Sequence, residues 1–187
     1  MTAGHCFALD AYVHRSDRAD FDEPGDWAPV GQVTRRALHG SQATDALAIR
    51  TKIPNLVPHG IFGSNGNLVP TGSPTKARVG NTLCYSGMSL DGVSCGEVTR
   101  IAMAWEGALR LGEYNVKFNK RVTDGDSGGP VWNPRTGAAV GVVAGFYPGT
   151  QISTVTPLLH PQGLRLSLVP GILHHPEMFD MHLITGN

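Results

Sequence analysis

Short runs of apolar or alternating residues recur along the chain, separated by Gly, Pro, Asn, Asp and Ser residues. Runs of this length between turn-forming residues are typical of β-strands. We expect strands at residues 30–33, 46–49, 81–85, 96–104, 114–118, 130–132, 138–145 and 152–155. This spacing predicts an all-β chain that folds as an antiparallel barrel or sandwich.

Three segments lack this pattern. Residues 7–29 are polar and acidic and contain a Pro-Gly pair, so we expect a surface loop there. Residues 51–76 are rich in Pro, Gly and Asn with little periodicity, and we expect them to connect two halves of the molecule. Residues 156–168 are compatible with a short C-terminal helix, although Pro161 and Gly163 interrupt the pattern.

Composition narrows the classes of partner. The 187 residues suffice for one ordinary domain with a core of its own. The 15 basic and 15 acidic residues give no formal net charge, so no nucleic-acid partner is expected. The longest apolar stretch, residues 138–146, is far shorter than the ~20 residues of a membrane-spanning helix, so no membrane partner is expected either.

The most informative segment, residues 124–131, reads Asp-Gly-Asp-Ser-Gly-Gly-Pro-Val. Glycines on both sides of Ser127 permit a sharp turn that exposes the serine oxygen and aims successive backbone N–H groups into one hole. His5, within Thr-Ala-Gly-His-Cys, is a candidate general base, and Asp45, directly before an apolar strand, is a candidate carboxylate. A serine hydroxyl becomes an effective nucleophile when an imidazole takes its proton and a carboxylate orients that imidazole.

These three blocks, in the order His, Asp, Ser, resemble the signature motifs of chymotrypsin-like serine proteases. Residues 80–98 are similar to a disulfide-closed hairpin of the bacterial, actinomycete-type branch of that family. The resemblance implies two perpendicular antiparallel β-barrels of the chymotrypsin type, with the catalytic residues in the cleft between them. It also implies a disulfide between Cys84 and Cys95, whereas Cys6 has no obvious partner.

By this resemblance, His5 would be the general base and acid, Asp45 would orient it, and Ser127 would be the nucleophile. The backbone N–H groups of Gly125 and Ser127 would form the oxyanion hole. Arg121 would lie near the floor of the specificity pocket. The residues facing the substrate would be Arg121, Ala144, Gly145 and Phe146.

The resemblance covers residues 2 to about 158 and implies a single protease domain, 1–187. Its parts would be a first-barrel remnant at 1–60, a connection at 61–78, a second barrel at 79–168 and a tail at 169–187. Only four residues precede His5, so we expect an incomplete first barrel. We also expect that the natural protein extends upstream, and that this short form is poorly soluble and weakly active.

Three positions depart from the family pattern. Ala144 stands where a serine usually supports the triad aspartate, and Phe146 stands where glycine is usual, so we expect it to narrow or close the pocket. Tyr85 stands where many bacterial members have an arginine paired with the aspartate before the nucleophile, here Asp126. We expect Asp126 to accept hydrogen bonds from the Tyr85 hydroxyl or from backbone N–H groups instead.

The sequence therefore predicts a serine endopeptidase that cleaves protein or peptide substrates through an acyl-enzyme intermediate, without a cofactor. We expect a monomer that is secreted or extracytoplasmic, as the resemblance and the cysteines imply. No metal is expected, because no carboxylate or cysteine pattern completes a site with His174, His175 and His182. Two alternatives stay open: a peptide-binding module with impaired catalysis, and an esterase that uses the same machinery.

Overall fold

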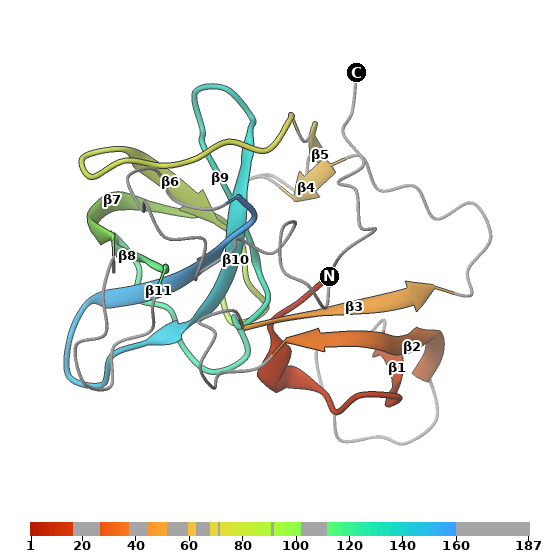
Figure 1. Ribbon diagram of the computed structural model, residues 1–187. Coiled ribbons are helices and arrows are strands. Elements are labelled where there is room, and N and C mark those ends of the chain that lie inside the picture. Colours follow the sequence, from red (N-terminus) through yellow and green to blue (C-terminus); the bar gives the residue numbers. More distant parts are fainter. Residues whose placement is uncertain are drawn as a thin grey trace.

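Strands dominate the computed structural model, and the residues that it describes form three separate sheets (Figure 1). The structure describes residues 1–16, 27–37, 45–51, 60–62, 68–70, 72–90, 92–101 and 112–159. One sheet is a closed barrel, one has three strands and one has two. The all-β class expected from the sequence is confirmed.

The first half of the chain forms a three-stranded antiparallel sheet in the order β1-β2-β3. Its strands are β1 (Tyr12–Ser16), β2 (Trp27–Ala37) and β3 (Ala46–Thr51). A short 3₁₀ turn, η1 (Gly4–Cys6), precedes them, and Thr2 bridges to Leu47 on the edge of β3 that β2 leaves open. Val13, Val33 and Leu47 bury their side chains together as the core of this half.

The second half closes six strands into a barrel in the order β10-β11-β8-β7-β6-β9. The strands are β6 (Thr82–Tyr85), β7 (Ser94–Ile101), β8 (Tyr114–Phe118), β9 (Pro130–Trp132), β10 (Ala139–Phe146) and β11 (Ile152–Pro157). Valines from β7, β8, β9, β10 and β11 fill the interior together with Leu83, Tyr85, Tyr114 and Phe118. A closed barrel has no open edge, which makes it a rigid base for the loops at its rim.

Three sequence expectations about these elements were wrong. The expected loop at residues 7–29 contains β1 and the start of β2, because Tyr12 is 60% exposed and Val13 only 7%, as the two faces of a strand require. The expected connection contains a two-stranded sheet, β4 (Gly60–Phe62) with β5 (Leu68–Pro70). Residues 156 and 157 end β11 instead of beginning a helix, since that strand stays paired with β10 up to Pro157.

Other expectations fall on residues outside the described ranges. These are residues 160–168 of the expected C-terminal helix, the tail and the three histidines at positions 174, 175 and 182. Within the described part of the chain, no helix is long and apolar enough to cross a membrane.

The disulfide between Cys84 and Cys95 is present, and it confirms the pairing that the resemblance implied. The two residues lie opposite each other on β6 and β7, with their α-carbons 4.0 Å apart. They pack against the buried Trp132 of β9. The bridge therefore fixes the hairpin of β6 and β7, in which Ser89, between the two strands, donates hydrogen bonds to the loop that carries Ser127.

Removing this bridge by replacing Cys84 and Cys95 with alanine is expected to lower the free energy of unfolding by about 3 kcal/mol, as the loss of so short a closed loop predicts. The cross-link lowers the conformational entropy of the unfolded chain, and this loss grows with the logarithm of the number of residues in the closed loop. The size of the expected effect therefore follows from the 11-residue separation of the two cysteines. Urea denaturation of both forms measures the difference. A double variant with an unchanged midpoint would show that the bridge contributes no stability.

Candidate active site

His5 and Asp45 form the first part of the site. Asp45 is fully buried, whereas the His5 side chain is 43% exposed. The backbone N–H of His5 donates to Asp45 Oδ1 at 2.9 Å, and its Nδ1 lies 2.7 Å from Asp45 Oδ2. These two hydrogen bonds fix both the position and the ring orientation of His5, so that Nε2 is the ring nitrogen left to face outward.

Close packing explains why a glycine, Gly4, precedes His5 in this site. A side chain at Gly4 would overlap the carbonyl oxygen of Ala37, and its Cβ would lie 2.9 Å from Asp45 Oδ1. The Gly4 carbonyl oxygen also accepts a hydrogen bond from Arg36 Nε at 2.8 Å. The glycine lets η1 approach the start of β3 closely enough for His5 to reach Asp45.

Ser127 lies in the loop that joins β8 to β9, at the rim of the barrel. Gly125 and Gly128, on either side of it, have φ angles of +94° and +85°, a region in which residues with a Cβ are strained. A Cβ at Gly128 would also overlap the Thr2 side chain, and Cys6 Sγ lies 3.8 Å from the Ser127 carbonyl oxygen. The segment that carries His5 is therefore packed directly against the loop that carries Ser127.

The backbone amides around Ser127 differ in how they are used. Those of Asp126, Gly128 and Gly129 donate to backbone carbonyl oxygens at 2.7 to 3.1 Å. No hydrogen bond within the described residues uses the amides of Gly125 or Ser127. These two amides, which sequence reasoning assigned to an oxyanion hole, are thus available to an oxygen atom of a substrate.

The buried Asp126 stabilises the loop that carries Ser127. It is 1% exposed, and its carboxylate accepts hydrogen bonds from the backbone N–H of Ser89 at 2.9 Å and of Thr123 at 3.0 Å. The expectation that backbone N–H groups stabilise this carboxylate is confirmed. The Tyr85 hydroxyl points to the Arg121 carbonyl oxygen, 3.4 Å away, and burial together with the negative charge of Asp126 raises the pKa of Tyr85.

Changing Gly87 to alanine is expected to disturb this loop, because the added Cβ would overlap Asp126 Oδ1. Overpacking of this kind costs about 1–3 kcal/mol of unfolding free energy, which thermal denaturation measures. The matched control is Gly72→Ala, whose Cβ would meet its nearest neighbours at an ordinary 3.4 Å. Equal stability of the two variants would contradict the tight contact between Gly87 and Asp126.

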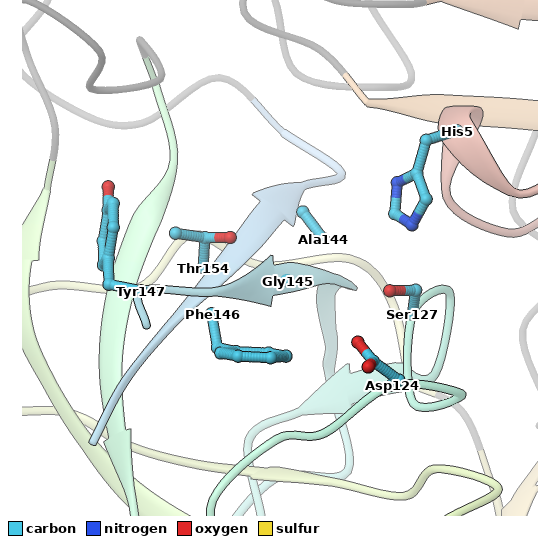
Figure 2. Close-up of a pocket in the computed structure, with 8 residues that line it drawn as sticks. All are labelled: His5, Asp124, Ser127, Ala144, Gly145, Phe146, Tyr147 and Thr154. Carbon is cyan, nitrogen blue, oxygen red and sulfur yellow. The ribbon is translucent and has the colours of Figure 1, made fainter. Parts of the chain in front are cut away.

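A pocket of about 430 Å³ opens beside Ser127 (Figure 2). Figure 2 shows the His5 ring and the Ser127 side chain at one end and Phe146 and Tyr147 toward the other. The residues that line it are His5, Asp124, Ser127, Ala144, Gly145, Phe146, Tyr147 and Thr154. The candidate base and the candidate nucleophile therefore share one concave site with the residues around the end of β10.

Of the four residues expected to face the substrate, three line the pocket and one does not. Ala144, Gly145 and Phe146 line the pocket, whereas Arg121 does not. The Arg121 guanidinium carbon instead lies 4.6 Å from the centroid of the Phe146 ring, a cation–π contact. Phe146 lines the open pocket, and the expectation that this side chain narrows the pocket stays a prediction.

Three lining residues, Asp124, Tyr147 and Thr154, were missed by sequence reasoning. Asp124 had an available signal, since it lies three positions before Ser127 in the same loop. Thr154 had none, because only the pairing of β10 with β11 places it opposite Gly145.

Known proteins are similar to this chain in structure rather than in sequence. No family model and no curated protein matches the sequence. Among solved structures, Cellulomonas bogoriensis chymotrypsin is 20% identical with a TM-score of 0.62, covering 84% of this chain and 77% of that chain. Thermobifida fusca protease A is 23% identical with a TM-score of 0.62, covering 83% and 75%. Nocardiopsis protease is 18% identical with a TM-score of 0.61, covering 83% and 76%.

These likenesses show a chymotrypsin-type fold for this chain. The closed six-stranded barrel is its second half, and the three-stranded sheet is its partial first half. The fold that the sequence resemblance implied, with an incomplete first barrel, is confirmed.

Proposed function

We propose that this protein is a serine endopeptidase in which Ser127, His5 and Asp45 act as the catalytic triad. The observation that carries the proposal is the doubly hydrogen-bonded pair of His5 and the buried Asp45, of which His5 lines one pocket together with Ser127. The fold supports it, since the similar structures are named as proteases.

Each residue has a role that its surroundings suit. Ser127 Oγ attacks the carbonyl carbon of the peptide bond while His5 Nε2 takes its proton. Asp45 holds the tautomer of His5 that has the proton on Nδ1, and its buried negative charge stabilises the imidazolium that forms. His5 then protonates the leaving amine, and a water molecule hydrolyses the acyl-enzyme by the same proton transfers in reverse.

The oxyanion hole of this proposal uses the amides of Gly125 and Ser127. Neither donates a hydrogen bond within the described residues, so both can donate to the negatively charged oxygen of the tetrahedral intermediate. The turn that orients them depends on the positive φ of Gly125 and on the hydrogen bonds to Asp126. A disulfide on the same barrel is consistent with an oxidising, extracytoplasmic compartment.

Labelling with a fluorophosphonate tests the proposal, because only an assembled triad and oxyanion hole activates a serine toward this reagent. We expect one covalent adduct per chain, located on Ser127 by peptide mass spectrometry. Absence of an adduct on folded protein would support the alternative of a non-catalytic binding module. Labelled protein that hydrolyses small esters but no peptide in a mixed peptide library would support the esterase instead.

A further inference from the structure

Ser89 contacts the Ser127 loop on both sides of Gly125. Its hydroxyl donates a hydrogen bond to the Asp124 carbonyl oxygen at 2.5 Å, and its backbone N–H donates to Asp126 Oδ1 at 2.9 Å. The hydroxyl also lies against the turn itself, because a Cβ at Gly125 would be 2.7 Å from Ser89 Oγ. The connection between β6 and β7 therefore holds the residue before and the residue after Gly125 through one serine.

The hydrogen bond to Asp124 determines which way the Gly125 amide points. A trans peptide group is planar, and its C=O and N–H bonds point in opposite directions. Because the Asp124 carbonyl oxygen is directed at Ser89, the Gly125 N–H is directed away from Ser89. Asp124 lines the pocket whereas Ser89 does not, and none of the described residues accepts a hydrogen bond from the Gly125 N–H. This orientation therefore leaves the N–H for an oxygen atom of a substrate.

The opposite orientation of this peptide group is open to the chain, because residue 125 is a glycine. Turning the peptide plane over takes the φ angle of Gly125 from +94° to the negative region, which glycine adopts about as readily. The Asp124 carbonyl oxygen would then face the pocket, and its partial negative charge would repel the oxygen of a tetrahedral intermediate. The glycine that permits the turn therefore also requires a contact that selects one orientation.

We propose that Ser89 is a positioning residue for the oxyanion hole, since its hydroxyl holds the Asp124–Gly125 peptide in the orientation that presents the Gly125 N–H to the substrate. This inference rests on the proposed function, because it concerns the amide that would stabilise the intermediate. The buried carboxylate of Asp126 anchors the amide of Ser89, so the hydroxyl is in place before a substrate binds. The N–H is thus oriented in advance, as electrostatic stabilisation of a transition state requires.

The test removes the hydroxyl alone, because Ser89→Ala keeps the backbone N–H that binds Asp126. For a peptide or ester that the wild-type protein hydrolyses, we expect kcat to fall by about 3- to 10-fold with KM unchanged, the range that one hydrogen bond contributes. Ser89→Thr keeps a hydroxyl and should retain the activity. The matched control is Ser86→Ala, which removes a hydroxyl of the same connection that forms no hydrogen bond with the described residues, and should change neither constant.

An analogue of the tetrahedral intermediate separates this role from a general effect on stability. Ser127 Oγ adds to the carbonyl carbon of an aldehyde, its proton passes to His5, and the electron pair of the C=O bond leaves a negative charge on the oxygen. In Ser89→Ala, the inhibition constant of the aldehyde that matches the substrate should rise by the factor by which kcat falls. Binding of the corresponding alcohol, which has no carbonyl group, should stay unchanged. Equal weakening of both compounds, or the same loss of kcat in Ser89→Thr, would overturn the role of Ser89.

The role of Ser89 and the proposed function can fail separately. If Ser127 reacts with the fluorophosphonate but Ser89→Ala keeps the full kcat, the role of Ser89 is wrong. If Ser127 does not react, the proposed function fails, and crystal structures of the wild-type and Ser89→Ala proteins are compared. An Asp124–Gly125 peptide that is turned over in Ser89→Ala alone then supports the role of Ser89, and the same orientation in both proteins overturns it.

Discussion

Replacing Ser127 with alanine is expected to abolish peptide hydrolysis, lowering kcat by about 10⁴- to 10⁶-fold. The hydroxyl is the atom that forms the acyl-enzyme in the proposed reaction, and no neighbouring side chain of the pocket can replace it in that position. Steady-state hydrolysis of a fluorogenic peptide measures the loss. The melting temperature should change little, because the side chain is partly exposed and forms no hydrogen bond within the described part of the chain.

The matched control is Ser73→Ala, which removes an exposed hydroxyl outside the pocket and should retain full activity. A Ser127→Ala protein that still cleaves peptides at more than about one hundredth of the original rate, beyond what the oxyanion hole alone supplies, would mean that another group is the nucleophile.

Asp45→Asn is expected to lower kcat by about 10⁴-fold while leaving the fold intact, since the two side chains have the same shape. The carboxylate accepts from both the backbone N–H and Nδ1 of His5. An amide in the same place keeps one acceptor for the backbone N–H but turns its NH₂ group toward Nδ1. That hydrogen bond favours the wrong tautomer of His5, with the proton on the nitrogen that has to accept it from Ser127.

Peptide hydrolysis and near-ultraviolet circular dichroism, measured on the same sample, separate loss of catalysis from loss of structure. Asp10→Asn provides the comparison for removal of a carboxylate that is exposed. A folded Asp45→Asn protein within about tenfold of the original kcat would show that His5 does not depend on this carboxylate.

The contact between His5 and Asp45 could be predicted from the sequence, although the residues are 40 positions apart. Both belong to compact motifs whose residue types are dictated by chemistry, and Gly4 is needed for the approach of the two segments. The barrel strands could be predicted for a similar reason, since their apolar residues alternate or run together between turns. A strand or a motif can thus be predicted from sequence when the residues that define it lie within one short segment.

The remaining features depend on pairing between distant segments. β1 was missed because its five residues adjoin a polar, acidic stretch, and only pairing with β2 makes it a strand. Thr154 lines the pocket because β11 aligns it with Gly145 of β10, where the register shifts at a bulge. The contact between Phe146 and Arg121 also depends on the fold, and the sequence alone does not show it.

Because Thr2 lies in close contact with Gly128, we expect Ser127 to become reactive only after the N-terminal segment has packed against its loop during folding. The barrel closes with strands from Thr82 to Pro157 alone, so its amides can become protected from hydrogen exchange before the N-terminal segment arrives. His5 reaches Ser127 only when that segment docks beside the Ser127 loop. In a refolding experiment, covalent labelling of Ser127 by a fluorophosphonate would therefore appear later than the protection of the barrel amides from hydrogen exchange. The time course of labelling would measure the rate of the final docking step.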